Sequence, residues 1–161
     1  MKRVLTLAAI FAIVISFFAC DKDVNERPNL DRTYLLTSSA WQIKHIRVVQ
    51  TGQDFVYDRG GSNNTFDFTN DYLEFQKDGS GTYWAGNDQY EISWQFDNSE
   101  KSELTYTIYN YADGHPQPGT DHLVKLENVF LSETSFRYAE LYTNNNGSHS
   151  AASVYRERAI K

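Results

Sequence analysis

From residue 41 onward, apolar and polar residues alternate along the chain. The clearest segment is residues 90–97, where every second residue is large and apolar: Tyr90, Ile92, Trp94 and Phe96. Successive side chains of an extended strand point to opposite faces, so this segment has one apolar face and one polar face. The pattern predicts a β-strand that packs one side on a core and turns the other toward water.

The same alternation recurs, less strictly, in other segments: Trp41–Val49, Tyr72–Gln76, Gly81–Trp84, Leu104–Tyr111, Leu123–Leu131, Ser135–Tyr142 and Ala152–Ile160. Together these make about eight strands, joined by turns rich in Gly, Asp and Asn. No helical periodicity follows residue 40, which excludes a parallel sheet covered by helices. We therefore predict an all-β fold, an antiparallel meander that closes into a barrel of about eight strands.

Three segments fall outside this pattern. Residues 30–39 carry apolar side chains at helical spacing after Asp31, a residue that favours the start of a helix, and predict one short N-terminal helix. Thr51–Asn70 and Ala112–Asp121 are predicted to be long loops at the barrel rim. The second loop contains two prolines, which disfavour the hydrogen-bond ladder of a sheet.

The first residues have the composition of an export signal. Lys2 and Arg3 are followed by an uncharged apolar run too short to span a bilayer. The run ends at Cys20, the single cysteine of the chain, and polar residues follow at once. This arrangement resembles a bacterial lipobox, although Phe17 and Phe18 stand where lipoboxes favour Leu and a small residue. The resemblance implies cleavage before Cys20 and its modification by a diacylglycerol with acyl chains such as palmitate.

These observations divide the chain into three parts. Residues 1–19 are the predicted signal peptide, residues 20–29 the lipidated cysteine and a flexible charged tether, and residues 30–161 the barrel domain. We expect the protein to be exported and lipid-anchored to the outer membrane of a Gram-negative bacterium, at its periplasmic or cell-surface leaflet. We also expect it to be a monomer. Because the chain has one cysteine, its fold is expected to be held together without a disulfide.

The charge balance excludes one class of partner. Without Lys2 and Arg3, the chain keeps 13 of its 15 basic residues against 21 acidic ones, a formal charge of −8. Binding a phosphate backbone requires a basic surface, and the sequence contains no basic cluster. Nucleic acid is therefore not a predicted partner.

Short motifs in the domain resemble the lipocalin family. Ser39–Trp41, directly after the predicted helix, is similar to the opening of a lipocalin, with Ser39 in place of the family's glycine. Tyr72–Tyr83 and Ile92–Trp94 resemble the second hairpin and the following strand of lipocalin-like domains on bacterial lipoproteins. The resemblance implies a barrel that binds a small molecule rather than catalysing a reaction.

The same resemblance implies how one end of the barrel is closed. In that family the tryptophan of the first strand plugs the barrel, and an arginine of the last strand lies across its ring as a stacked cation. The corresponding tryptophan is Trp41, and either Arg156 or Arg158 supplies the cation.

Tyrosine, with 11 residues, is the most frequent aromatic residue in the chain. A tyrosine buries its ring while its hydroxyl still needs a partner, so a tyrosine-rich interior suits an amphipathic ligand. The candidate ligand-binding residues are Tyr90, Ile92, Trp94, Phe96, Tyr106 and Tyr138. A barrel of about eight strands has room for its own side chains or for one small ligand, so a filled and a hollow interior are both open.

No catalytic residue, cofactor or metal site is predicted. The closest histidines, His115 and His122, do not have the spacing of zinc ligands, and no calcium-loop series is present. The chain also lacks a Gly-x-Ser-x-Gly nucleophile motif, and an acylated Cys20 has no free thiol. An enzyme is therefore not expected.

Two functions remain. The first is a membrane-anchored lipoprotein whose barrel binds a small apolar or amphipathic ligand, which enters between the two long loops. The alternative is a non-catalytic accessory or adhesion module of a cell-surface complex. It would contact a protein or glycan through exposed aromatic residues, namely Tyr57, Tyr83, Trp84 and Tyr111.

Overall fold

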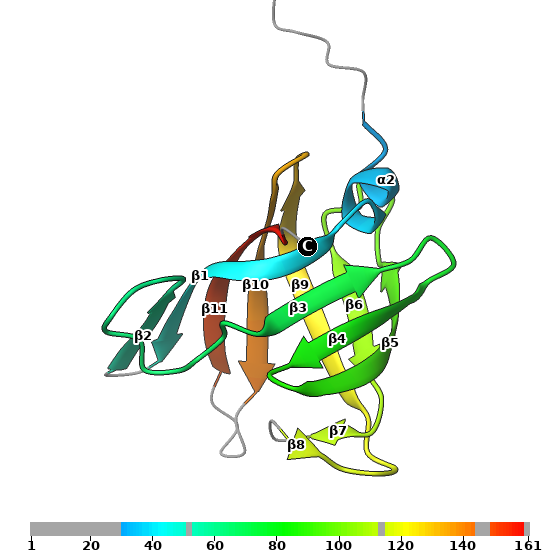
Figure 1. Ribbon diagram of the computed structural model, residues 1–161. Coiled ribbons are helices and arrows are strands. Elements are labelled where there is room, and N and C mark those ends of the chain that lie inside the picture. Colours follow the sequence, from blue (N-terminus) through cyan, green and yellow to red (C-terminus); the bar gives the residue numbers. More distant parts are fainter. Residues whose placement is uncertain (1–29, 51–52, 113–114, 144–148, 160–161) are drawn as a thin grey trace, which may run out of the picture. The chain divides into compact units, whose positions relative to one another are not determined.

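The computed structural model describes residues 30–50, 53–112, 115–143 and 149–159 (Figure 1). The predicted signal peptide and tether, and with them Cys20, lie outside these ranges. The described residues from Asp31 onward belong to one structural unit. None of the helices in these ranges has the length and apolar character needed to cross a bilayer.

Eight antiparallel strands form a closed barrel. In barrel order they are β1 (Ala40–Gln50), β3 (Asp71–Phe75), β4 (Ser80–Ala85), β5 (Asp88–Phe96), β6 (Leu104–Ile108), β9 (His122–Leu131), β10 (Ser135–Thr143) and β11 (His149–Arg158). β11 pairs back with β1, for example Trp41 with Arg158, and this pairing closes the barrel. The predicted fold class is confirmed, and every predicted strand segment corresponds to one barrel strand.

The alternation that predicted β5 is reproduced in its burial. Tyr90 and Ile92 are 8% and 3% exposed, whereas Glu91 and Gln95 between and after them are exposed. Toward the end of the strand, Trp94 is only half-buried. One face of β5 therefore packs on the barrel interior and the other faces water, as period-two patterning requires.

Two predicted loops contain additional strands. β2 (Gln53–Asp58) pairs with the second half of β1, while the first three residues of β1 pair with β3 on the same edge. The register between β1 and β11 shifts between Ile43 and His45, near the point where β1 changes partner. β7 (Tyr111–Ala112) and β8 (His115–Pro116) form a separate short hairpin. β7 and β8 have two residues each, too few to show alternation, whereas β2 is longer than β3 and lay unrecognised within a predicted loop.

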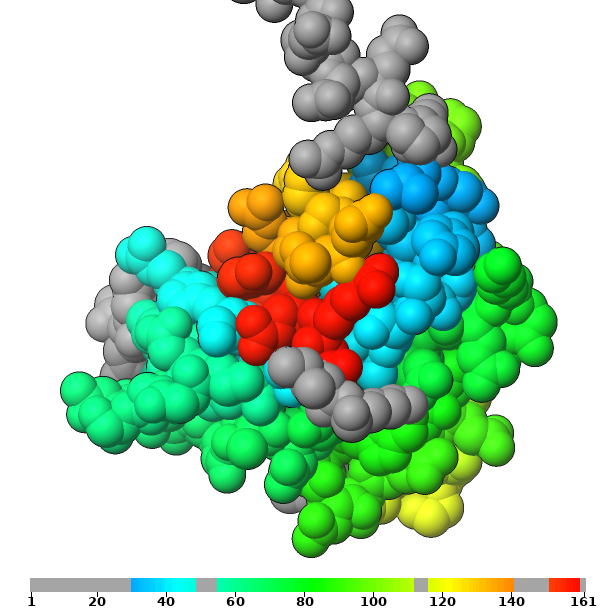
Figure 2. All heavy atoms as spheres, turned by 45° about the horizontal axis from the view of Figure 1, so that its top comes forward, coloured from blue at the N-terminus to red at the C-terminus, as the bar shows by residue number. Residues whose placement is uncertain are grey.

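The helix α2 (Arg32–Thr37) lies at one end of the barrel, and its N-cap is Asp31, which accepts a hydrogen bond from the backbone of Thr33. Leu36 is fully buried, and its carbonyl oxygen accepts a 2.8 Å hydrogen bond from Trp41 Nε1. Figure 2 shows α2 (blue) beside the C-terminal strand (red) and the β9–β10 turn (orange). Large side chains fill the interior at this end: Trp41, Phe75, Phe136, Leu73, Leu104 and Leu126.

Candidate ligand-binding cavity

The barrel is hollow at the end away from α2. A cavity of about 310 Å³ opens there, close to where β6 ends and β9 begins. Its aliphatic wall comes from β1, β6, β9 and β11, through Ile43, Ile46, Ile108, Val124 and Val154. The two interiors that the sequence left open are therefore both present, a filled half under α2 and a hollow half opposite it.

Aromatic side chains make up much of the remaining wall. Tyr83, Tyr106 and Tyr138 come from barrel strands, Tyr111 from the β7–β8 hairpin and Phe68 from the segment between β2 and β3. The ring centroids of Tyr83 and Tyr111 are 5.8 Å apart in an edge-to-face arrangement. Both segments that the sequence placed at the rim, or residues next to them, thus border the cavity.

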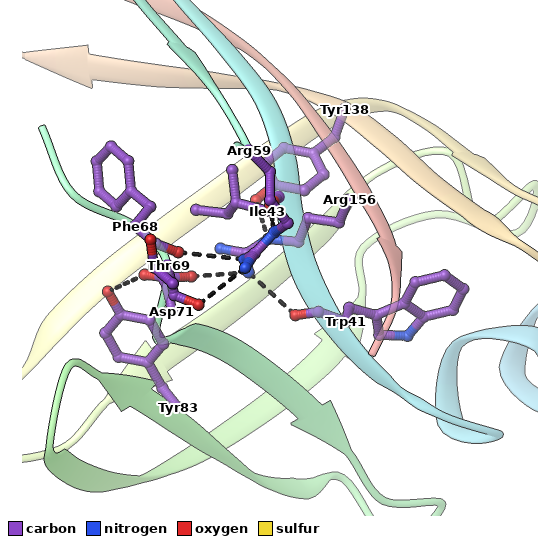
Figure 3. Close-up of polar contacts among 9 residues, drawn as sticks. All are labelled: Trp41, Ile43, Arg59, Phe68, Thr69, Asp71, Tyr83, Tyr138 and Arg156. Carbon is purple, nitrogen blue, oxygen red and sulfur yellow. Dashed lines mark hydrogen bonds and ion pairs between the residues drawn. The ribbon is translucent and has the colours of Figure 1, made fainter. Parts of the chain in front are cut away.

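A buried ion pair crosses the cavity wall (Figure 3). Arg156 Nη1 lies 2.8 Å from Asp71 Oδ1, and the two side chains are only 5% and 6% exposed. Tyr83 donates a 2.8 Å hydrogen bond to the other oxygen of Asp71. Arg156 in turn donates to the Tyr138 hydroxyl at 2.9 Å and to the backbone carbonyl of Trp41 at 3.2 Å. The pair is therefore embedded in a network of side chains from four strands and one backbone carbonyl of β1.

The burial of this network changes the acidity of its members. Burial, together with the nearby carboxylate of Asp71, raises the pKa of Tyr83. Burial also raises the pKa of Tyr138. Burial opposes the charge of Arg156, but its neighbours Tyr138 and Asp71 outweigh this effect and hold the pKa of Arg156 above its usual value. The tyrosines are thus neutral donors and the arginine a cation at any physiological pH.

Tyr106 places a polar group of a different kind in the cavity. The residue is 5% exposed, and burial raises the pKa of its hydroxyl well above the usual value. Across the described residues, no hydrogen bond joins this hydroxyl to another protein group, although the side chain lines the cavity. A hydroxyl that lines a cavity without a protein partner is a binding point for a ligand oxygen or a water molecule.

Arg59 holds one side of the cavity in place. Its guanidinium donates to the carbonyl oxygens of Ile43 at 2.6 Å, Thr69 at 2.9 Å and Phe68 at 3.2 Å. These bonds fasten the segment after β2 to the middle of β1, as Figure 3 shows. Phe68 is thereby positioned at the wall of the cavity.

A second, smaller hollow of about 130 Å³ adjoins the first. It shares Ile46 and Phe68 with the main cavity and is otherwise lined by Val48, Phe55, Val56, Tyr57 and Phe66. The aromatic rings form a connected cluster, with centroid distances of 5.8 Å for Phe55 and Phe66 and 5.3 Å for Tyr57 and Phe68. We call this hollow the apolar groove, because none of the residues that line it is charged.

The structure brings two of the six candidate ligand residues to the cavity, Tyr106 and Tyr138. The other four, all on β5, are not among its lining residues: Tyr90, Ile92, Trp94 and Phe96. The Tyr90 ring lies 4.8 Å from that of Tyr111, and the Trp94 ring packs edge-on against Phe75 at 5.5 Å. The rings of Tyr90, Trp94 and Phe96 thus pack on other aromatic rings of the protein.

The closure residues divide their roles. The Arg158 guanidinium lies 6.0 Å from the centroid of the Trp41 ring and donates to Ser38 Oγ at 2.9 Å. Arg156, two residues earlier on the same face of β11, points into the cavity network instead. The two arginines that the resemblance left as alternatives therefore have different contacts.

The exposed aromatic surface expected for the alternative function is only partly present. Tyr57 is 2% exposed, so the expectation that it faces solvent is wrong, and its ring packs on Phe68 instead. Tyr83, Trp84 and Tyr111 are half-buried. Phe66, at 52% exposed, is the aromatic side chain that reaches solvent near these residues.

Asp71, Glu140 and Arg59 are site residues that the sequence did not single out, and His122, which the sequence weighed only as a zinc ligand, also lines the cavity. A signal for the two carboxylates was present, because Asp71 shares the inward parity of Leu73, and Glu140 that of Tyr138. A charged residue at an inward-facing position indicates a buried network or a site. Within the described ranges, no three His, Cys, Asp or Glu side chains gather as metal ligands.

Comparison with known proteins does not assign this chain to a family. No family model matches the sequence, and no curated protein matches it significantly.

Proposed function

We propose that the chain is a lipid-anchored, lipocalin-like protein that binds a small amphipathic molecule inside its barrel. One observation carries the proposal: a cavity of about 310 Å³ whose wall combines aliphatic and aromatic side chains with a few buried polar groups. Small-molecule sites have this character, with volumes from about 300 to 1,000 Å³ and a small number of well-placed polar groups.

Asp71 is a structural member of the cavity wall. Its Oδ2 accepts a hydrogen bond from Tyr83, and its Oδ1 lies 2.8 Å from Arg156 in an ion pair, without a hydrogen bond of its own among the described residues. Asp71 thus helps to hold Tyr83 and Arg156 at the cavity, where their polar groups can contact a bound molecule.

The anchor rests on the sequence of the first twenty residues. An export signal that ends at a single cysteine is the arrangement in which lipidation places a protein at a membrane. Because each buried CH₂ of an acyl chain contributes about 0.8 kcal/mol, the several chains of a lipoprotein give stable attachment. The barrel would then present its cavity close to a source of lipids.

A cavity-filling variant tests the binding function. Val124 lies on β9, is 4% exposed and lines the cavity, whereas its neighbour Leu123 is 55% exposed on the outer face. We expect Val124→Trp to abolish binding of a neutral fluorescent probe such as N-phenyl-1-naphthylamine. Leu123→Trp should leave probe binding unchanged.

The proposal fails if the wild-type barrel does not bind the probe or any lipid extract component in native mass spectrometry. It also fails if Val124→Trp, shown by circular dichroism to be folded, binds the probe as well as Leu123→Trp does. In either case the hollow would be a water-filled feature of the fold.

A further inference from the structure

The charges at the cavity wall disfavour an anionic ligand. Arg156 is the one arginine among the described residues that line the cavity, and Asp71 neutralises it at 2.8 Å. Asp71 and Glu140 both bring carboxylates to the same wall. A ligand carboxylate or phosphate that entered the cavity would lose its hydration and find no unpaired arginine there. Burial of such an unpaired charge is costly.

Two hydroxyl groups on the wall can still form hydrogen bonds with a ligand. The Tyr106 hydroxyl has no protein partner in the described residues, and the Tyr138 hydroxyl, which accepts from Arg156, still carries its own proton. Burial keeps both hydroxyls protonated by raising their pKa values. These groups hydrogen-bond an uncharged oxygen, such as that of an alcohol, ester or amide, without any charge having to be compensated.

The apolar groove lies directly beside the cavity. Ile46 and Phe68 line both hollows, so they mark where the two adjoin. Beyond these two residues the lining is aliphatic and aromatic, with Phe55, Val56 and Phe66. Burial of a hydrocarbon chain against such a lining is favourable by about 25 cal/mol for each Å² of apolar surface removed from water.

We propose that the ligand is an uncharged amphiphile with one hydrocarbon chain. Its hydroxyl- or carbonyl-bearing head lies beside Tyr106 and Tyr138, and its chain passes Ile46 and Phe68 into the apolar groove. This inference rests on the proposed function, because it names the ligand class for the same cavity. Its basis is the combination of a neutralised arginine, a cavity-lining hydroxyl without a protein partner and an adjacent apolar groove.

Three compounds with the same chain and different heads provide the test: octanol, octanoate and octylammonium. Each is titrated at about pH 8 into the barrel loaded with N-phenyl-1-naphthylamine, and its affinity is taken from displacement of that probe. We expect octanol to bind at least about tenfold more tightly than octanoate or octylammonium, because the charged heads must be desolvated. The inference is overturned if either ion binds as tightly as octanol.

The outcomes separate this inference from the proposed function. If octanoate or octylammonium displaces the probe best, the barrel is still a binding protein and only the ligand class is wrong. If the probe itself does not bind, the proposed function falls, and the inference falls with it.

Two variants test where the head and the hydrocarbon chain of the ligand bind. Tyr106→Phe removes the unpartnered hydroxyl and should lower the affinity for octanol by about five- to tenfold. Tyr109→Phe is the control, because it removes a hydroxyl that is bonded to Ser93 outside the cavity, and it should leave this affinity unchanged. Phe66→Ala should lower the affinity for octanol more than that for butanol, because only the longer chain reaches the apolar groove. Phe130→Ala, on the outer face of β9, should lower neither affinity. Equal losses for octanol and butanol in Phe66→Ala, or no loss in Tyr106→Phe, would contradict the assigned orientation.

Discussion

Asp71 and Arg156 form an ion pair that spans β1, because Asp71 begins β3 on one side of that strand and Arg156 lies in β11 on the other. The Trp41 carbonyl in β1 accepts a further hydrogen bond from the same guanidinium. Three neighbouring strands are thereby joined inside the barrel at the point where its closure takes place. The pair therefore supports the closure of the barrel as well as the wall of the cavity.

We expect Asp71→Asn to lower the free energy of unfolding by about 3 to 5 kcal/mol, because Arg156 would remain buried without its counter-ion. Urea denaturation followed by circular dichroism measures the change. Glu157→Gln is the matched control, since its ion pair with Lys44, at 3.6 Å, is partly exposed and should contribute less than about 1 kcal/mol. Equal losses in the two variants would show that the buried pair has no special role.

Tyr57→Phe should raise the free energy of unfolding by about 1 kcal/mol. The Tyr57 hydroxyl is buried and has no hydrogen-bond partner among the described residues, so it has lost its water without compensation. Tyr83→Phe removes a hydroxyl that donates to Asp71 and should instead destabilise the fold. Chemical denaturation of both variants tests whether the free energy of unfolding rises in Tyr57→Phe and falls in Tyr83→Phe. A destabilised Tyr57→Phe would show that the hydroxyl has a partner, such as an ordered water.

Stability should fall when the pH rises above about 10. Burial raises the pKa values of Tyr83 and Tyr138 from the ordinary 10.0, so the folded state favours their neutral forms. The stability that this provides is complete below the unfolded pKa, and it is lost as the pH climbs toward the folded values. Unfolding free energies between about pH 8 and pH 12, recorded beside tyrosinate absorbance, measure the effect. If all tyrosines ionise near pH 10 while the barrel stays folded, the raised pKa values are refuted.

The barrel itself could be predicted from the sequence, whereas much of its cavity could not. Alternation is a local property, so segments such as Tyr90–Asp97 reveal their two faces without knowledge of any partner. The partner of Asp71, by contrast, lies on a strand far along the chain, and only the closure of the barrel brings the two together. Parity alone identified which side chains point inward, but not which half of the barrel large rings such as Phe75 and Trp41 would fill.

The same distinction explains the misplaced aromatic residues. Tyr57 belongs to β2, which pairs with the part of β1 that extends beyond β3. No local sequence pattern indicates that β1 extends in this way. Phe68 reaches the cavity because Arg59 binds its carbonyl, a contact made by a single side chain within an irregular segment. Such contacts depend on tertiary structure, and they decide whether an aromatic residue is exposed or lines a site.

Replacement of Arg59 should loosen the wall that carries Phe68. Arg59→Ala removes three charge-assisted hydrogen bonds to backbone carbonyls, and we expect faster hydrogen exchange in residues 59–70 and weaker probe binding. Arg59→Lys keeps the charge without the planar guanidinium, so it should restore only part of the loss. Lys125→Ala, an exposed cation on β9, is the control that should change neither measurement. Unaltered exchange in Arg59→Ala would remove the proposed role of this arginine.

Membrane attachment should depend on Cys20 alone. Cys20→Ser keeps a side chain of similar size but removes the thiol that lipidation requires, so we expect the protein to move from the membrane fraction to the soluble fraction. Metabolic labelling with palmitate should mark the wild type and Asp21→Ser, but not Cys20→Ser. Because the barrel residues are unchanged, probe binding should be equal in all three proteins. Continued fractionation of Cys20→Ser with membranes would show that an uncleaved signal segment, rather than a lipid, holds the protein there.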